Sequence, residues 1–433
     1  MRDENLEFLY GLTREGVKLD LEVMRAFDDM LGNPHRAYRT IHITGSNGKG
    51  SVSALLYNIM MQRFPSGLYT SPHLIEFNER ILFNDRFIPD EYIVSFIGKY
   101  RPVIEELARE KRNPTFFETT TGMAFKYFSD AGARFASIEV GLGGRLDSTN
   151  IIEPEVSVIT SVGYEHADKL GCSLTSISYE KGGIIKPGRP VVLGDRKAEV
   201  VDTVRRISQV RKSRLYLTWR DVKVSDVHLS LQGTSFRAET EGETYDVESP
   251  LVGTFQVTNI GTAILAAEAS GQFDRRQIEQ GIRETLWPAR LQRVRDEPPV
   301  VVDCAHNPPA ANALVQAFRQ VSPDTRPVLV VGMLKDKDHF SYISSLRSLS
   351  DRIIVTTPYE ENRAEDPEHI ASLARRIYRE VRVIRDAREA YDYALSLGTP
   401  VLVTGSIYLV GHVMAWEGVD VRPFTRKKVK LLE

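Results

Sequence analysis

Cysteine is almost absent from this chain of 433 residues, which carries only Cys172 and Cys304. Two thiols are too few for a disulfide framework or a thiolate metal site, so both are expected to be free. No apolar run reaches bilayer length, and the N-terminal residues are acidic and lack the apolar core of a signal peptide. These absences argue against a membrane protein or a disulfide-stapled class and make a cytoplasmic location the expectation.

The chain also lacks an excess of charge of either sign, because 56 Lys and Arg residues face 58 Asp and Glu residues. Without a basic field, neither nucleic acid nor an anionic membrane is expected as the partner. The sequence has no internal repeat or low-complexity tract, and the short basic tail at residues 426–430 is interpreted as a solvated chain end. The length predicts two or three domains, and we expect a monomer that binds small molecules.

Glycine is concentrated in one segment, where Gly45, Gly48 and Gly50 flank Lys49 between an apolar strand and a helix predicted over residues 51–62. Glycines let a backbone turn tightly and present its N–H groups to phosphate oxygens, while the helix start adds positive potential. The segment departs from the usual phosphate-loop pattern, because Gly50 separates Lys49 from Ser51. An ordinary loop would leave Lys49 unexplained, so the sequence predicts a nucleotide phosphate site.

The alternation of apolar β-rich runs with helical patterns predicts an α/β fold with parallel sheets. In the first part, strands are predicted at 135–140 and 156–160, a small antiparallel β elaboration between 215 and 252, and a helix at 257–269. In the second part, strands are predicted at 300–302, 328–331, 353–356, 381–384 and 401–404, and helices at 310–320, 340–349, 367–380 and 387–397.

The proline-bearing segment 287–299 separates these two parts and suits a linker or hinge. We therefore predict a phosphate-loop domain over 1–286 and a doubly wound domain over 287–433. A cleft between two such domains is a common place for a ligand.

Several polar residues lie near predicted strand ends, where α/β proteins bind ligands. Glu139 ends an apolar strand, so its carboxylate either binds Mg²⁺ beside the nucleotide or pairs with Arg145. His166 is either a ligand or an ordinary loop residue. Lys181 and Lys186 by themselves suggest no more than a solvated helix end.

The second part offers a similar group after its first strand. Asp303 is placed either to accept hydrogen bonds from ribose hydroxyls or to cap the following helix. His306 and Asn307 follow in the turn, and Arg290 in the hinge is suited to a phosphate or to a surface carboxylate. These residues support a two-domain enzyme that binds ATP and Mg²⁺, without identifying the acceptor.

Taken together, the motifs resemble the folylpolyglutamate synthase and dihydrofolate synthase family within the Mur ligase superfamily. The segments that carry the resemblance are 44–51, 69–74, 78–81, 139–150, 165–171, 180–187, 303–308 and 404–410. They occur in the family's order over most of the chain. The resemblance implies a two-domain Mur-ligase-like architecture.

The resemblance also implies roles for individual residues. The ATP site would consist of Thr44, Gly45, Ser46, Asn47, Gly48, Lys49, Gly50, Ser51, Asn259, Arg290 and Asp303. Ser71, Glu139 and His166 would bind Mg²⁺, and Lys181 matches a lysine that is carbamylated in this family. Lys49, Lys181 and His306 would be catalytic, His306 at the γ-phosphate or the incoming glutamate.

The reaction implied is ATP-dependent amide formation between a pterin-linked carboxylate and L-glutamate, through an acyl phosphate. Residues similar to dihydropteroate-contacting segments of bifunctional relatives favour both activities, and they are Asp20, Phe116, Phe117, Glu118, Leu146, Asp147 and Ser148. Two alternatives are another Mur-type ligase acting on a cell-wall or other carboxylate precursor, and a nucleotide-binding regulatory protein.

Four positions depart from the family pattern. Phe255 stands where many relatives carry histidine, Ala289 replaces a hinge glycine, Glu165 replaces an aspartate, and Cys304 stands where glycine is common. None of the four is a predicted metal ligand. The first two put the geometry at adenine and at the hinge in question.

Overall fold

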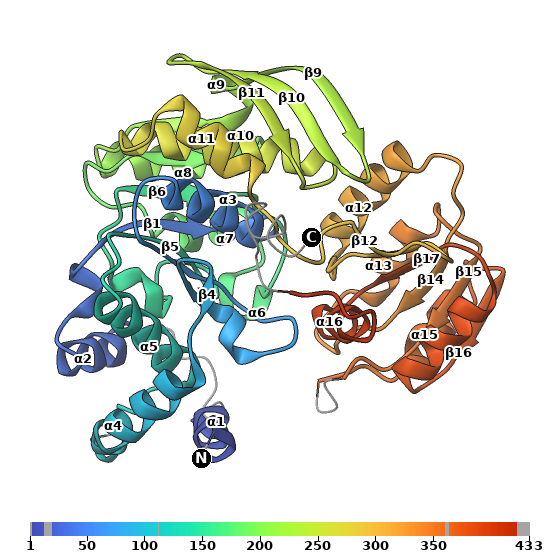
Figure 1. Cartoon of the computed structure of the whole chain (residues 1–433), viewed down its shortest axis with the longest axis horizontal. Coiled ribbons are helices and arrows are strands. Elements are labelled where there is room, and N and C mark those ends of the chain that lie inside the picture. Colours follow the sequence, from blue (N-terminus) through green and yellow to red (C-terminus); the bar gives the residue numbers. More distant parts are fainter. Residues whose placement is uncertain (1, 13–19, 111, 360–362, 422–433) are drawn as a thin grey trace.

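The computed structural model describes residues 2–12, 20–110, 112–359 and 363–421. The basic tail at 426–430 and residues 18 and 19, next to Asp20, lie outside these ranges. Within these ranges the chain folds into three sheets with their helices, and Figure 1 shows the first two on one side of the molecule and the third, orange to red, on the other. No described helix combines the length and apolarity needed to cross a bilayer.

The first sheet has β1 near its centre and the strand order β4-β3-β2-β5-β1-β6-β7-β8. Its strands are β1 (Arg39–Thr44), β2 (Ser66–Tyr69), β3 (Ile81–Phe83), β4 (Arg86–Phe87), β5 (Phe135–Glu139), β6 (Val156–Ile159), β7 (Val191–Leu193) and β8 (Leu215–Leu217). All of these strands run in one direction except β3, which pairs antiparallel with β2 and with β4 at one edge. The carboxyl ends of β1, β5 and β6 therefore meet at one edge of the sheet.

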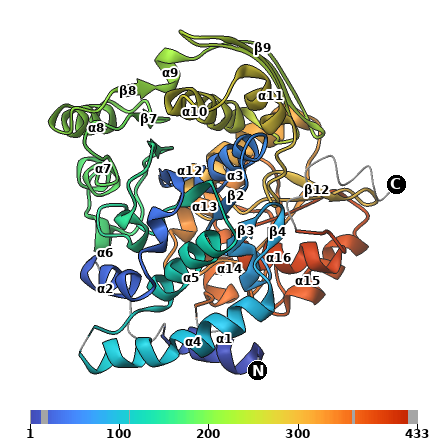
Figure 2. The ribbon, with the colours of Figure 1, turned by 60° about the vertical axis from the view of Figure 1, so that its left-hand side comes forward.

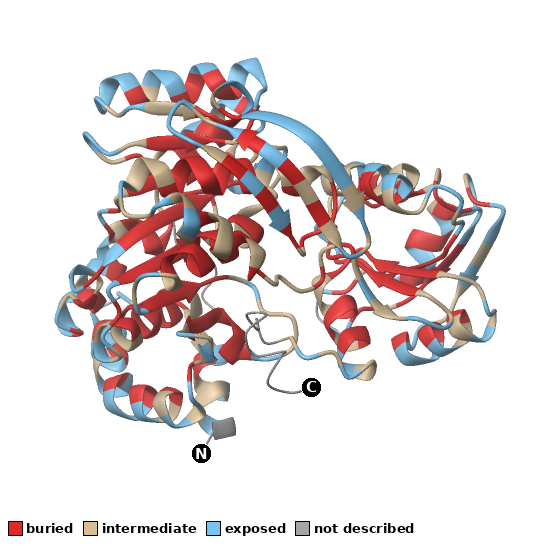
Figure 3. Ribbon diagram, turned by 45° about the horizontal axis from the view of Figure 1, so that its top comes forward, coloured by how far each residue is buried: buried red, intermediate tan, exposed pale blue. Residues whose placement is uncertain are grey.

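Helices cover both faces of this sheet and explain why its strands are continuously apolar. One core contains side chains of α1 (Arg2–Gly11), α2 (Glu22–Met30), α4 (Asp90–Arg109) and α5 (Phe116–Asp130). Another contains side chains of α3 (Lys49–Met61), α10 (Thr254–Ser270) and α11 (Arg275–Arg283). A third, smaller core involves α7 (Leu174–Gly182) and α8 (Ala198–Val210), which follow the short α6 (Ala167–Leu170). Figure 3 shows the strands as buried between exposed helix faces.

The second sheet is the predicted antiparallel elaboration, made of β9 (Lys223–Ser230), β10 (Gly233–Glu239) and β11 (Thr244–Ser249) after the short α9 (Thr218–Asp221). Burial alternates along β10, where Phe236 and Ala238 face the core shared with α10 and α11. Figure 2 shows the sheet lying over these two helices at one end of the molecule.

The third sheet is the doubly wound part, with the order β12-β13-β17-β14-β15-β16. Its strands are β12 (Gln292–Arg295), β13 (Val300–Val302), β14 (Val328–Val331), β15 (Arg352–Val355), β16 (Glu380–Val383) and β17 (Val401–Thr404). Its helices are α12 (Pro308–Val321), α13 (His339–Leu346), α14 (Pro367–Ala374), α15 (Ala387–Ser396) and α16 (Ile407–Trp416). All of its strands are parallel except β12.

Two predictions for this part were wrong in detail. The helix predicted over 367–380 ends at Ala374, because the backbone N–H groups of Arg379 and Glu380 bond to the Asp351 carbonyl and lead into β16. The segment 287–299 is not only a linker, since it contains β12, which pairs antiparallel with β13. The predicted boundary between residues 286 and 287 falls between α11 and β12, and as a division into domains it stays a prediction.

Candidate active site

The glycine-rich loop joins the end of β1 to the start of α3, as its sequence predicts, and each glycine lies where a side chain would collide. A Cβ on Gly45 would lie 1.9 Å from Thr160 Oγ1, and one on Gly48 would lie 2.6 Å from the Asn259 side chain. Gly45 and Gly48 also have φ values of +154° and +90°. The glycines are thus explained by close packing as well as by the turn.

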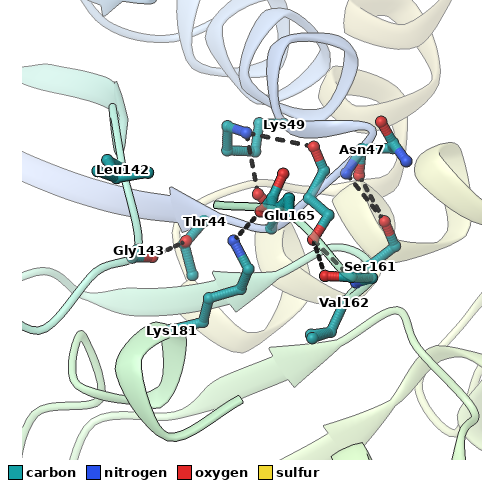
Figure 4. Close-up of polar contacts among 12 residues, drawn as sticks. Thr44, Asn47, Lys49, Leu142, Gly143, Ser161, Val162, Glu165 and Lys181 are labelled. Carbon is teal, nitrogen blue, oxygen red and sulfur yellow. Dashed lines mark hydrogen bonds and ion pairs between the residues drawn. The ribbon is translucent and has the colours of Figure 1, made fainter. Parts of the chain in front are cut away.

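Polar contacts hold this loop in place (Figure 4). The Asn47 backbone N–H donates to Ser161 Oγ at 3.0 Å, and Ser161 Oγ donates to the Asn47 carbonyl at 2.9 Å. Lys49 Nζ lies 2.9 Å from the Gly45 carbonyl and 3.4 Å from the Ser46 carbonyl. Thr44 Oγ1 donates to the Gly143 carbonyl at 2.6 Å. The ammonium group of Lys49 therefore stays at the loop, where a phosphate would lie.

Glu139 lies at the carboxyl end of β5, beside this loop. It does not pair with Arg145, which bonds Glu180 at 2.9 Å, so that alternative was wrong. Burial raises the pKa of Glu139 to about 7, and the charges of Lys49 and Arg290 and a hydrogen bond from the Ser71 backbone oppose this shift. A cavity of about 70 Å³ contains Glu139, Ser71 and Arg290 among its lining residues.

Lys181 is 1% exposed, so it is not a solvated helix end. Its Nζ lies 2.7 Å from Glu165 Oε1, an ion pair that Figure 4 shows below the phosphate loop. Burial lowers the pKa of Lys181 to about 8, although Glu165 opposes the shift. Burial would raise the pKa of Glu165, but Lys181 and Lys49 outweigh it and hold that pKa at about 2.

The other two basic residues of this region differ in position. Lys186 is also partly buried, and its Nζ donates to the Asn150 carbonyl at 2.9 Å, away from Glu165. His166 is exposed, with φ +45°, and burial of part of its ring lowers its pKa. Of the three predicted metal ligands, Ser71 and Glu139 are therefore in contact, whereas His166 lies on the loop after β6, where Glu165 and Lys337 act on it.

The third-sheet half contributes Arg290, Asp303 and His306. Asp303 accepts hydrogen bonds from the backbone N–H groups of Leu291 and Ala305, both at 2.8 Å. It does not cap α12, because Asn307 is the N-cap and accepts from the Ala310 N–H at 2.9 Å. Asp303 instead holds the hinge segment at Leu291 against the third sheet.

His306 of this half has a ring whose orientation is fixed by the backbone. Its Nδ1 lies 2.9 Å from the Cys304 carbonyl, so Nδ1 carries the proton and Nε2 has a free lone pair. Burial, followed by the charge of Lys337, lowers the pKa of His306 to about 4. The imidazole is therefore neutral near pH 7 and is a weak base.

A pair of amides connects the two halves directly. Asn47 Nδ2 lies 3.3 Å from Asn307 Oδ1, and Asn307 Nδ2 lies 3.1 Å from Asn47 Oδ1. Because Asn47 belongs to the phosphate loop and Asn307 begins α12, the loop contacts the second half through this pair.

The residues predicted to contact a pterin lie in part together. Phe117 stacks on Tyr69 with ring centroids 6.1 Å apart, and the Tyr69 hydroxyl bonds Thr121, which in turn lies 3.2 Å from Ser148 Oγ. Phe117 also lies against Gly141. This places an aromatic ring next to buried hydroxyl groups.

The other members of this predicted set have structural contacts of their own. Glu118 completes a capping box at the start of α5, and Asp147 accepts hydrogen bonds from Leu142 and Thr149. Phe116 packs against Phe77 and Tyr10. Asp20 bonds the backbone of Glu22, and Leu146 is half-buried.

Sequence reasoning missed three residues of the site. Gln256 bridges Ser51, at 3.4 Å, and Asn259, at 2.9 Å, so it joins α10 to the phosphate loop. Trp287 packs against Gly50, where an added Cβ would lie 2.8 Å from Nε1. Lys337 acts on His306 from the loop after β14. The spacing of Gln256 and Asn259 on one helix face was the only signal in the sequence.

The hinge departure is visible in the backbone. Ala289, which replaces the family glycine, has φ +59°, and Leu291 has φ +47°. Both lie in the left-handed region that disfavours residues with a side chain. The Cys304 N–H donates to the Ala289 carbonyl at 3.1 Å. Cys304, which stands where glycine is common in the family, is buried.

Comparison with known proteins gives the family. Residues 43–267 match the Mur ligase middle domain, and residues 289–407 match the Mur ligase glutamate ligase domain. The chain is 35% identical to the folylpolyglutamate synthase of Lacticaseibacillus casei, over 88% of this chain and 91% of that protein. The chain belongs to the folylpolyglutamate synthase and dihydrofolate synthase family. It is therefore an ATP-dependent ligase.

Other members of the family support this assignment. The dihydrofolate synthase/folylpolyglutamate synthase of Bacillus subtilis is 32% identical over 94% of this chain and 96% of that protein. Folylpolyglutamate synthase of Mycobacterium tuberculosis complexed with ADP has a TM-score of 0.90 and 30% identity, covering 97% of this chain and all of that one. The chain spans half the length of a probable bifunctional folylpolyglutamate synthase/dihydropteroate synthase of Haloferax volcanii, to which it is 33% identical over 94% of its own length.

Proposed function

We propose that this ligase joins the α-amino group of L-glutamate to a pterin-linked carboxylate, with release of ADP and phosphate. The observation that carries the proposal is the convergence on Glu139. A buried carboxylate at the end of β5 lies under the charges of Lys49 from the phosphate loop and Arg290 from the other half. Positive groups from both halves thus surround the position where ATP and a second anion would meet.

The chemistry follows from the poor reactivity of a carboxylate as an acyl donor. Attack of the substrate carboxylate on the γ-phosphorus of ATP gives an acyl phosphate and ADP, and the glutamate amine then displaces phosphate from the acyl carbon. Lys49 stabilises charge on the transferring phosphoryl group, and Arg290 binds phosphate from the opposite side. The remaining loop residues hold the α- and β-phosphates through backbone N–H groups.

His306 is assigned the proton transfer of the second step. The glutamate amine must reach the acyl carbon unprotonated, and the Nε2 of neutral His306 would accept a proton from that nitrogen as it bonds to the acyl carbon, when the nitrogen becomes acidic. Asp303 and Asn259 would contact the ribose and the base of the nucleotide. Closing of the two halves would exclude water that hydrolyses the acyl phosphate.

The residues near Glu139 fit a divalent cation. The carboxylate is buried, and the Ser71 backbone bonds it. Ser71 and Glu139 would hold one Mg²⁺ and His166 a second, and the ions would supply charge neutralisation at the phosphates. The chain itself provides positive potential at the same place through Lys49 and Arg290.

We also propose that Lys181 is carbamylated in the active enzyme. The low pKa of the amine leaves more of it neutral at pH 8 than in an ordinary lysine, and a neutral amine captures CO₂. The carbamate would replace the Lys181–Glu165 ion pair by two anions, which a cation must offset. The modification and the second metal should therefore depend on each other.

Lys181→Ala should lose most activity and recover part of it with added acetate. Lys186→Ala is the matched control and should stay close to wild type, since Lys186 donates to the Asn150 carbonyl and lies 3.9 Å from Glu153, away from Glu165. Carbon-13 NMR of protein supplied with labelled bicarbonate and Mg²⁺ would detect the carbamate. A fully active Lys181→Ala variant would remove this part of the mechanism and leave the ligase assignment standing.

The substrate is tested directly with ATP, Mg²⁺, glutamate and a panel of pterin acids, by reading product masses. Products one glutamate heavier from dihydropteroate, tetrahydrofolate or both support the proposal and decide between one and two activities. A product only from a cell-wall-type precursor would favour another Mur ligase. ATP hydrolysis that does not require both the acid substrate and glutamate would contradict ligation. The cytoplasmic location and the monomeric state stay predictions.

A further inference from the structure

A group of possible metal ligands lies in the third-sheet half, apart from the proposed Mg²⁺ ligands. It consists of His339 at the start of α13, Glu365 just before α14, and His369 in the first turn of α14. One ligand atom of each lies within 4.8 Å of the others. His339 Nδ1 is 3.8 Å from Glu365 Oε2, and the two imidazole rings have centroids 5.5 Å apart at 74°.

Hydrogen bonds orient two of these side chains. His339 Nε2 lies 2.9 Å from the Leu334 carbonyl, so Nε2 carries the proton and the lone pair of Nδ1 faces Glu365. Glu365 Oε1 accepts the Asp366 N–H at 2.9 Å, which leaves Oε2 toward the histidine. A histidine that donates its second ring nitrogen to a backbone carbonyl is the usual arrangement of a metal ligand.

The backbone also fixes the two segments against each other. The Glu365 N–H donates to the Met333 carbonyl at 2.9 Å, and Leu334 and Ala364 form an isolated β-bridge. His339 is buried, the Glu365 side chain is 21% exposed, and His369 is exposed. The site is therefore anchored on one side and open to solvent on the other.

We propose that His339, Glu365 and His369 bind a divalent transition metal ion of the zinc class, with water as the fourth ligand. Two imidazole nitrogens and one carboxylate suit Zn²⁺ or Co²⁺ and disfavour Mg²⁺, which prefers oxygen ligands. Metal–ligand distances of about 2.0–2.2 Å place tetrahedral ligands roughly 3.4 Å apart. The exposed His369 side chain needs only a small movement to reach that spacing.

A bound ion would anchor residues 334–338, the loop that joins β14 to α13. This loop faces the candidate active site, since the charge of Lys337 acts on both His306 and His166. The ion would fix the end of that loop without contacting substrate. The three ligands are thus structural residues, and their effect on the reaction is through position.

Equilibrium dialysis of the full chain against Zn²⁺, in excess Mg²⁺ and ADP, tests the proposal. A Cys172→Ser background removes the exposed thiol. We expect one tight Zn²⁺ per chain, with the Kd raised at least tenfold in His369→Ala and in Glu365→Gln. His228→Ala, at an exposed histidine of β9, is the matched control and should leave the Kd unchanged.

Two further readouts exclude an effect on folding alone. Co²⁺ should give d–d absorption in the wild type and in His228→Ala and not in His369→Ala, and Zn²⁺ should raise the melting temperature of only the first two. Equal Zn²⁺ affinity in wild type and His369→Ala would overturn the proposal. So would loss of Zn²⁺ binding in His166→Ala with retention in Glu365→Gln, because the ion would then lie at the active site.

Discussion

Lys49 is held at the phosphate loop by the carbonyls of its own turn, within the field of Glu139. A lysine in this state can exchange two neutral acceptors for a phosphate without leaving its position. A few charged side chains such as Lys49 should dominate the chemistry of the site, because each lies where little water screens its charge. Their removal should change chemistry more than folding.

Lys49→Ala should lower the rate of phosphate release by at least a hundredfold, about 3 kcal/mol of transition-state stabilisation, the usual effect of removing one preorganised charge. The melting temperature should change little, since Lys49 lies outside the hydrophobic core. Coupled-enzyme kinetics with saturating substrates would measure the loss. Lys223→Ala, at an exposed position of β9, is the control, and equal rates in the two variants would contradict the role of Lys49.

Glu139→Gln should change how stability depends on pH. Because burial raises the pKa of Glu139 to about 7, the folded protein holds a proton that the unfolded chain has released between about pH 4.5 and 7. Without Mg²⁺, wild-type stability should therefore fall as the pH rises through this window, by on the order of 3 kcal/mol more than in Glu139→Gln.

Urea unfolding at pH 5 and pH 8 measures this difference. Glu241→Gln, at an exposed side chain, should follow the wild type. Mg²⁺ with an ATP analogue should restore stability at pH 8 in the wild type and not in Glu139→Gln. Parallel pH profiles for all three proteins would show that Glu139 is not the titrating group.

Among the elements, helix α3 is the one on which the site depends, because it begins at Lys49 and is buried along most of its length. It packs closely on α11, where Gly281 faces the backbone of Ile59. The strands were predictable from sequence where they are short apolar runs, and β13, β14 and β17 have the predicted bounds. Helix α14 was predicted too long. Glu380 pairs with Arg352 of β15, and this strand pairing overrides the helical preference of the residues just before Glu380.

The site residues show the same limit of prediction from a single sequence. The glycine loop was predictable, since its residues are adjacent in the chain. Gln256 and Trp287 were not, because their roles come from contacts with Ser51 and Gly50, more than 200 positions away. Apart from the helical spacing of Gln256 and Asn259, contacts of that kind leave no pattern in a single sequence.

Gly281→Ala should destabilise the protein by about 1–3 kcal/mol, the usual cost of overpacking, although alanine favours a helix. Its Cβ would lie 2.5 Å from Ile59 Cα and 2.6 Å from Ile59 N, so α3 and α11 must separate. The KM for ATP should rise as α3 tilts. Gly98→Ala in α4 is the control, since its Cβ would meet no atom within 4 Å beyond its chain neighbours and its own helix backbone, and it should stabilise the protein slightly. Similar denaturation midpoints for the two variants would exclude the close contact.

At the scale of the whole molecule, the two halves meet through packing of α10 and β9 on α12, through polar contacts and through a short connection. The Asn47–Asn307 pair ties the phosphate loop to α12, and residues 289–291 hold two left-handed backbone conformations. Asp303 fixes Leu291 to the third sheet, so Arg290 must move with the second half. The position of Arg290 relative to Lys49 is therefore a measure of how far the halves are closed.

Asn307→Asp should loosen this arrangement without harming α12. Aspartate keeps the N-cap, while the amide donor to Asn47 is lost and a negative charge is added beside the phosphate loop. We expect a larger radius of gyration in small-angle X-ray scattering and a KM for ATP raised about tenfold. Asp386→Asn changes the cap of α15 in the same half and should alter neither value. An unchanged radius and KM in Asn307→Asp would show that the amide pair does not hold the halves together.

The antiparallel strand β12 has a consequence for how this protein can be divided. The third sheet takes its outermost strand from the connecting segment, so a fragment that starts at Pro299 would expose the backbone of β13 as a bare edge. Unprotected edges pair with other chains and lead to aggregation. A soluble C-terminal fragment should therefore begin upstream of Gln292. A protease cut after Arg295 would separate the two halves and would also leave β13 with an aggregation-prone edge once β12 dissociates.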